Sequence, residues 1–120
     1  MIRRDVNFGK GKIKGLVTIS RKYWDIGKLT TNADKILLKG NKTSFELATK
    51  EIKSVEIVTH RTLKILKITM HNEDHYHVSS IPEEPAAMGA DPNDYFMFLE
   101  QDTERKNERL LTALQEFLNP

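Results

Sequence analysis

The stretch KILLKGNKTSFELATKEIKSVEIV, residues 35–58, contains three short apolar runs that are separated by residues with turn chemistry. The runs 35–39 and 43–48 flank the turn residues 40–42, and the third run begins at Ile52 after a short jog. Glycine and asparagine tolerate tight or left-handed backbone, so a turn between two strands suits them. Short runs bounded by turns are typical of neighbouring antiparallel strands. The stretch therefore predicts a meander and a mainly β fold.

The same pattern continues on both sides of this stretch. Upstream, IKGLVTIS at residues 13–20 alternates apolar and polar side chains, which is the period-two signature of a strand, and residues 26–31 form another short run. Downstream, LKILKITM (63–70) and HYHVSS (75–80) are joined by the polar turn NED, so we expect a hairpin. The chain is thus expected to form six or seven strands.

The last third of the chain has a different composition. Residues 81–94 hold three of the four prolines, and because proline fixes φ and removes a backbone donor, we expect a loop there. YFMFLEQ, residues 95–101, has the apolar cluster of a further strand. Over residues 103–118, leucine and phenylalanine recur every three or four positions, which predicts an amphipathic helix with Asp102 or Thr103 as its N-cap.

A single core is expected where the inward faces of the strands meet the apolar face of this helix. The residues that we expect in it are Val17, Ile19, Leu37, Phe45, Leu47, Val55, Ile57, Leu66, Ile68, Val78, Leu111, Leu114 and Leu118.

Length and composition indicate one domain over residues 1–120. A chain of 120 residues can bury one core without covalent staples. It contains no cysteine, so it has neither disulfides nor a thiolate zinc site, and it suits a reducing compartment. No apolar run approaches the ~20 residues of a membrane span. We therefore expect a cytoplasmic protein.

The net charge of +2 conceals an uneven distribution along the chain. Residues 1–70 contain 16 Lys and Arg against 6 Asp and Glu, whereas residues 71–120 contain 3 against 11. One interpretation is that the two parts attract each other within the fold; the other is a basic face for an acidic partner. The acidic second part disfavours nucleic acid as that partner.

Three segments resemble PH-like domains of the GRAM-like and prokaryotic PH-like type: KGLVTISRKYW (14–24), KLTTNADKILLKG (28–40) and TSFELATKEIKSVEI (43–57). In those domains a strand, a turn, an apolar strand and a phrase of the type F-x-x-x-x-x-E-I-x-x-V follow one another. The resemblance implies a bent antiparallel barrel of six or seven strands that is capped by a C-terminal helix.

KGLVTISRKYW and KTSFELATKEIKSVEI (42–57) are also similar to segments of archaeal chemotaxis adaptors of the CheF type. Members of that family connect a response regulator to the archaellar motor. This second resemblance implies a protein-interaction adaptor that has no catalytic activity.

The candidate partner-binding residues surround the predicted strand 13–20; they are Lys10, Lys12, Lys14, Arg21 and Lys22. If Val17 and Ile19 face the core, Lys12 and Lys14 point outward together, one pleat apart. Phosphoinositide-binding PH domains hold basic residues in the same region. A solvated strand face, a surface for an acidic protein and a surface for an anionic lipid all remain open. We expect an acidic protein partner, such as a response regulator, with an anionic lipid as second choice.

Three histidines, His71, His75 and His77, fall in the segment HNEDHYHV. If Tyr76 and Val78 face inward, the imidazoles lie on the outer face of one hairpin, where they would either ligate a transition metal or simply be solvated. We expect no metal, because no fourth ligand is visible in the sequence.

No catalytic or cofactor signature is present. The chain lacks cysteine, a Gly-x-Ser-x-Gly elbow, a phosphate loop and a Gly-x-Gly-x-x-Gly fingerprint, so we expect neither an enzyme nor a cofactor. Trp24 beside Tyr23 fits a stacking platform for single-stranded nucleic acid or a core position, and the core position is favoured.

Overall fold

The computed structural model describes residues 1–11, 24–60, 63–81 and 92–119, with side chains from residue 100 onward in the last range. Its elements are the strands β1 (Arg3–Lys10), β2 (Asp25–Asn32), β3 (Lys35–Gly40), β4 (Ser44–Ala48), β5 (Ile52–His60), β6 (Leu63–Met70) and β7 (His75–Ser80), a 3₁₀ turn at Thr49–Glu51 and the helix α1 (Pro92–Leu118).

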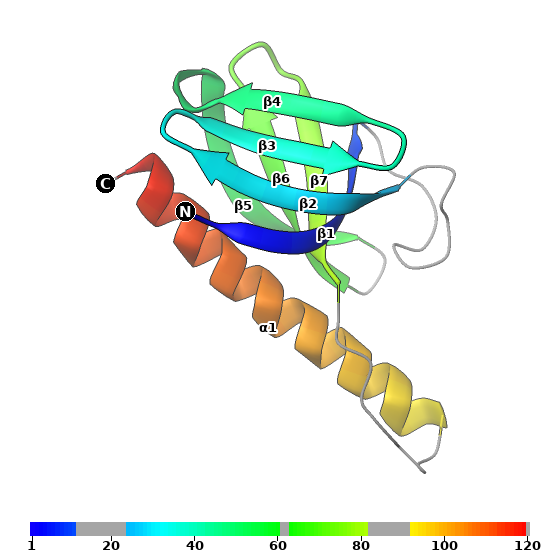
Figure 1. Ribbon diagram of the computed structural model, residues 1–120. Coiled ribbons are helices and arrows are strands. Elements are labelled where there is room, and N and C mark those ends of the chain that lie inside the picture. Colours follow the sequence, from blue (N-terminus) through cyan, green and yellow to red (C-terminus); the bar gives the residue numbers. More distant parts are fainter. Residues whose placement is uncertain (12–23, 61–62, 82–91, 120) are drawn as a thin grey trace.

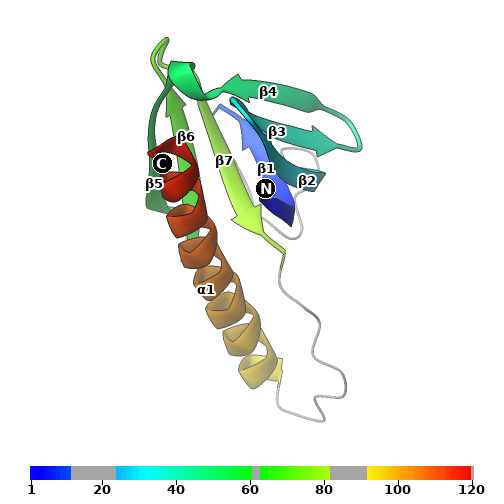
Figure 2. The same ribbon diagram turned by 60° about the vertical axis from the view of Figure 1, so that its left-hand side comes forward.

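The seven described strands form one antiparallel sheet in the order β4-β3-β2-β1-β7-β6-β5. The sheet curls into a half-barrel, as Figures 1 and 2 show. All sheet neighbours except β1 and β7 are consecutive in the chain, so β1 joins the two halves of the sheet. This fold is mainly β with one C-terminal helix, as predicted, and it is compatible with a PH-like fold.

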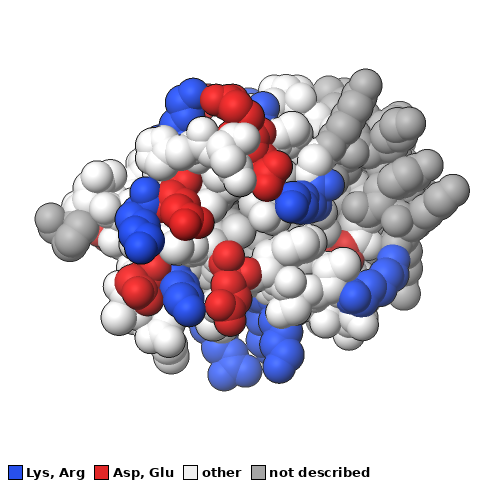
Figure 3. All heavy atoms as spheres, turned by 90° about the horizontal axis from the view of Figure 1, so that it is seen from above, with Lys and Arg blue, Asp and Glu red and all other residues white. Residues whose placement is uncertain are grey.

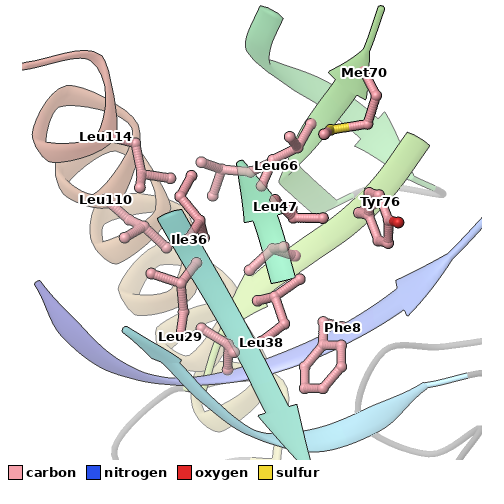
Figure 4. Packing of buried hydrophobic residues seen from close by; sticks show 13 residues of the cluster. Phe8, Leu29, Ile36, Leu38, Leu47, Leu66, Met70, Tyr76, Leu110 and Leu114 are labelled. Carbon is pink, nitrogen blue, oxygen red and sulfur yellow. The ribbon is translucent and has the colours of Figure 1, made fainter. Parts of the chain in front are cut away.

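The helix α1 lies against one side of the curled sheet, and its N-terminal turns extend beyond the strands (Figures 1 and 2). Its 27 residues correspond to a length of about 40 Å, and it contacts β5, β6 and β7. Leu110 and Leu114 point from α1 toward the sheet and are fully buried (Figure 4). They close the main core, whose other buried members are Val6, Phe8, Leu29, Ile36, Leu38, Leu47, Leu66, Ile68, Met70, Tyr76 and Val78.

Most of the strand predictions are confirmed. The runs 26–31, 35–39 and 43–48 correspond to β2, β3 and β4, and the jog at 49–51 is the 3₁₀ turn. The predicted hairpin is formed by β6 and β7. The predicted strand 13–20 lies outside the described residues.

The strand β1 was not predicted. Its sequence, RRDVNFGK, is rich in charge and contains only two large apolar residues, Val6 and Phe8, so hydrophobic periodicity gives little signal. Both residues are fully buried, and the strand is held by backbone pairing with β2 on one side and β7 on the other. Pairing with two neighbours compensates for the weak local pattern.

The predictions around the C-terminal helix were partly wrong. The predicted loop 81–94 ends too late, because α1 begins at Pro92, and the predicted strand 95–101 is helical. Proline is favoured in the first turn of a helix, where its missing N–H has no partner to lose. Asp102 and Thr103 are therefore interior helix residues and not N-caps, and the predicted helix 103–118 is the C-terminal part of α1.

The core prediction holds for Leu47, Leu66, Ile68, Val78 and Leu114, which are buried. Leu37 was wrongly placed: its neighbours Ile36 and Leu38 point into the core, so the period-two geometry of β3 turns Leu37 to the other face. The remaining described members are only partly buried: Phe45, Val55, Ile57, Leu111 and Leu118. Val17 and Ile19 lie outside the described residues.

Among the described residues, no helix combines the length and the apolar character that a membrane crossing requires.

Candidate anion-binding pocket

A pocket of about 430 Å³ lies where β1 begins, β7 ends and the middle of α1 passes both strands. The residues that line it are Arg3, Arg4, Asp5, Ser80, Ile81, Lys106 and Arg109. Four of these seven side chains are cationic and one is anionic. The lining therefore has a surplus of three positive charges.

Sheet pairing and helix periodicity bring these residues together. Val6 of β1 is paired with Ser80 of β7, and the Ile81 N–H donates to the Asp5 carbonyl oxygen (3.2 Å) just beyond the last strand pair. On α1, Lys106 and Arg109 are three residues apart, so they lie on one side of the helix. The buried core thus fixes the two walls of the pocket.

The three arginines have no acidic partner within the described part of the chain. No carboxylate there lies within ion-pair distance of the guanidinium groups of Arg3, Arg4 and Arg109. Among the described residues, the only hydrogen bond of these groups is that of Arg4, which donates to the Arg3 carbonyl oxygen (3.1 Å). Guanidinium groups bind carboxylate or phosphate through paired donors, so these arginines are available for an anion.

The other two charged residues of the lining are engaged. Asp5 accepts a hydrogen bond from Lys28 Nζ (2.6 Å), and this bond, followed by the charge of Lys28, lowers the pKa of the Asp5 carboxyl. Lys106 Nζ lies 3.2 Å from an oxygen of the buried Asp102 and donates to the Ile81 carbonyl oxygen (3.3 Å). Asp5 therefore remains ionised at neutral pH but is largely neutralised by Lys28.

Asn107 anchors the helix side of the pocket. Its side chain is fully buried; Oδ1 accepts from the Ser80 N–H (2.7 Å), and Nδ2 donates to the Lys64 carbonyl oxygen (2.9 Å) and to Ser79 Oγ (3.3 Å). One amide thus joins α1 to both β6 and β7. A buried polar network is stable when every member is paired, so this contact fixes the position of Lys106 and Arg109 over the sheet.

The Ser80 hydroxyl, unlike the Ser80 N–H, does not take part in this hydrogen-bond network. The side chain is 3% exposed, and within the described residues its hydroxyl oxygen has no hydrogen-bond partner. An unpaired buried polar group costs about 1–3 kcal/mol. Ser80 also lines the pocket, so an incoming hydrogen-bond acceptor is one way to remove this cost.

Of the residues predicted to bind a partner, only Lys10 is described. It is about half exposed, and its Nζ lies 3.5 Å from Asp74 and 5.8 Å from the centre of the Tyr76 ring. Lys10 thus contacts the β6–β7 hairpin and does not reach the pocket. Lys12, Lys14, Arg21 and Lys22 lie outside the described residues.

The histidines do not form a metal cluster. The rings of His75 and His77 are 5.4 Å apart, while the His71 backbone is bound to the 3₁₀ turn through the Glu51 carbonyl. His77 Nδ1 is 3.1 Å from the Gly11 carbonyl oxygen, and burial lowers the pKa of His77. Over the described ranges, no group of three or more His, Cys, Asp and Glu side chains is placed to hold a metal ion.

Trp24 packs in a core, as favoured by the sequence. It is 2% exposed and forms a second, smaller cluster with Ile65, against which Val58 and Leu63 pack. The His60 ring meets the Trp24 ring edge to face, with the ring centres 5.8 Å apart. A tryptophan this buried offers no face for base stacking.

Asp25 serves a structural purpose. It is buried at the start of β2, and its carboxylate accepts hydrogen bonds from the backbone N–H groups of Asn41, Lys42 and Thr43 and from the Thr43 hydroxyl. Burial raises the pKa of Asp25, but the hydrogen bonds outweigh burial and lower it below its ordinary value. The carboxylate is saturated with donors, so it holds the β3–β4 turn.

The basic lining contrasts with another face of the molecule. In the view of Figure 3, blue Lys and Arg side chains of the described residues are interspersed with red Asp and Glu side chains. Such interspersed charges give no extended field of one sign. On the face in this view, the described residues therefore form no patch of a single charge sign, unlike the lining of the pocket.

The pocket residues were not predicted as a site. Arg3 and Arg4 belong to the unpredicted β1, and Lys106 and Arg109 lie within the predicted helix 103–118 but were not assigned a role. The one sequence signal is the adjacency of two arginines at 3–4 and the three-residue spacing of Lys106 and Arg109. Comparison with models of known protein families and with curated proteins finds no match.

Proposed function

We propose that the protein is a non-enzymatic binding module, an adaptor that holds an anionic group of an acidic protein partner in the basic pocket. One observation carries the proposal: β1 and α1 bring four cationic side chains to one pocket, and three of them have no carboxylate partner among the described residues. Cations gathered in a hollow focus the field on an incoming anion and raise the association rate.

The sequence resemblances support the same class of function. PH-like domains serve as interaction modules, and the CheF-type resemblance supports a response regulator of archaeal chemotaxis as the acidic partner. Lys10, Lys12, Lys14, Arg21 and Lys22 are proposed to contribute to the attraction of the same acidic partner. An anionic membrane is the competing partner, and the experiment below includes it.

The proposal is tested with a fluorescently labelled peptide rich in Asp and Glu, whose binding is followed by anisotropy at several salt concentrations. The pocket variant is Arg4→Glu with Arg109→Glu. The matched control, Lys39→Glu with Lys50→Glu, changes the net charge equally at exposed residues that do not line the pocket.

We expect the pocket variant to bind the peptide at least about tenfold more weakly than the control, since each hydrogen bond between charged groups contributes about 1.5–3 kcal/mol. The difference should shrink as salt rises, because exposed charges are screened over ~8–10 Å. Equal losses in the two variants would show that net charge and not the pocket governs binding. Cosedimentation with phosphatidylserine vesicles in the absence of peptide binding would favour the membrane instead.

A further inference from the structure

We propose that the anionic group held in this pocket is a single phosphate monoester, carried by a soluble molecule or a protein side chain. The inference rests on the proposed function, because it specifies the chemistry of the anion that the module recognises. Three features of the pocket support it: the amount of charge, the type of donor and the shape of the surroundings.

The charge of the lining matches a dianion better than a carboxylate. Four cations against one carboxylate leave three positive charges, and that carboxylate, Asp5, is already bound to Lys28. A carboxylate would neutralise only one of them. A phosphate monoester carries between about −1.5 and −2 at neutral pH and offers three acceptor oxygens. It is therefore the common biological anion that best uses both the charge and the number of donors.

The donors also come from two different elements. Arg4 of β1 and Arg109 of α1 line the same pocket, and each carries a planar guanidinium fork that binds phosphate through paired donors. The volume of about 430 Å³ exceeds that of one phosphate group and leaves room for the atoms that carry it.

The Ser80 hydroxyl supplies a neutral donor at the same place. The register with Val6 puts the Ser80 side chain on the face of the sheet against which α1 packs, and Ser80 belongs to the lining. Its hydroxyl has no partner among the described residues, although Ser79 beside it is bonded to Asn107. A phosphate oxygen would give this hydroxyl an acceptor, and a third acceptor oxygen is what a phosphate has and a carboxylate lacks.

The surroundings favour a discrete phosphate over the surface of a bilayer. Glu108 is exposed and precedes the pocket residue Arg109 in the sequence of α1, so an anionic membrane at this face would also meet a carboxylate. Membrane-bound modules insert large apolar side chains, and Met1 is the only fully exposed one within the described ranges. A phosphate on a small molecule or on one protein side chain can enter the pocket without meeting the exposed carboxylate and without needing inserted apolar side chains.

The test is isothermal titration calorimetry of the protein with O-phosphoserine and with inorganic phosphate, using glutamate and acetate as carboxylate controls at matched ionic strength. The variants are Arg4→Gln with Arg109→Gln, Ser80→Ala, and the surface control Lys39→Gln with Lys50→Gln. Thermal unfolding of each variant confirms that it is folded, which is expected because both arginines are exposed.

We expect saturable binding of both phosphate probes and at least about tenfold weaker binding of the two single carboxylates. The double arginine change should weaken phosphoserine binding about 100-fold and Ser80→Ala about tenfold, whereas the surface control should leave it unchanged. Carboxylates that bind as well as phosphate, or phosphate binding that survives the arginine changes, would overturn the inference.

Two further outcomes separate this inference from the proposed function. If the acidic peptide binds the pocket and phosphoserine neither binds nor competes, the binding module stands and the phosphate assignment fails. If phosphatidic acid vesicles are bound while soluble phosphates are not, a lipid surface replaces the proposed ligand. If neither peptide nor phosphate depends on the arginines, both proposals fail together.

Discussion

Replacing Asn107 by alanine should destabilise the protein more than any change at the neighbouring exposed positions of α1. The substitution removes the acceptor of the Ser80 N–H (2.7 Å) and a donor to the Lys64 carbonyl oxygen (2.9 Å), both at a fully buried side chain. Each backbone group left unpaired costs about 1–3 kcal/mol, and the better helix propensity of alanine returns about 0.5 kcal/mol. We therefore expect the free energy of unfolding to fall by about 2–5 kcal/mol.

The assay is urea unfolding followed by circular dichroism, with Glu108→Ala as the matched control. Glu108 is the next residue of α1, and its side chain is exposed. For a domain of this size the predicted loss corresponds to a decrease in melting temperature of roughly 8–20 °C. If the free energies of unfolding of Asn107→Ala and the control differ by less than about 0.5 kcal/mol, the amide does not hold the helix to the sheet and the reasoning fails.

Three other outcomes are expected. Leu114→Ala should lower the free energy of unfolding by about 2–5 kcal/mol in the same assay, because the side chain is fully buried and leaves a cavity; a loss below 1 kcal/mol would contradict its burial. Because hydrogen bonds lower the folded-state pKa of Asp25, its contribution to stability is present above the unfolded value of 3.8 and is lost as the pH falls through the folded value. Urea unfolding of wild type and Asp25→Asn between pH 7 and pH 3 should show that the wild type loses its advantage only in acid. Lys12→Glu with Lys14→Glu should leave the melting temperature nearly unchanged but slow association with the acidic peptide in stopped-flow measurements. If the double variant associates as fast as the wild type at low salt, this prediction is wrong.

Local sequence signals predicted the elements whose residues bury one face. Leu66 and Ile68 of β6 and Tyr76 and Val78 of β7 alternate with polar residues, so their period of two was readable without any tertiary information. The aromatic residues of 95–101 were misleading, because β propensity reflects packing in a half-buried sheet and the same residues are accepted by a helix.

The candidate site was largely inaccessible to sequence reasoning. Lys10, Lys12 and Lys14 are close in sequence and were therefore predicted to bind a partner. Arg4 and Arg109, in contrast, line one pocket only because β1 and α1 come together in the fold. The pairing of β1 with β7 is the step that creates the pocket, and no local pattern in RRDVNFGK reports it. Charge counts along the chain indicated a basic first part but not the pocket, because Lys106 and Arg109 come from the acidic second part.

The position of β1 between β2 and β7 has a kinetic consequence. Because β1 pairs with β7 and α1 packs on β7, the pocket depends on contacts of high sequence separation. Such contacts are costly in loop-closure entropy, so we expect them to form late on the folding pathway. A molecule bound between Arg4 and Arg109 would stabilise the native state but not the transition state, so it should slow unfolding while leaving the folding rate almost unchanged.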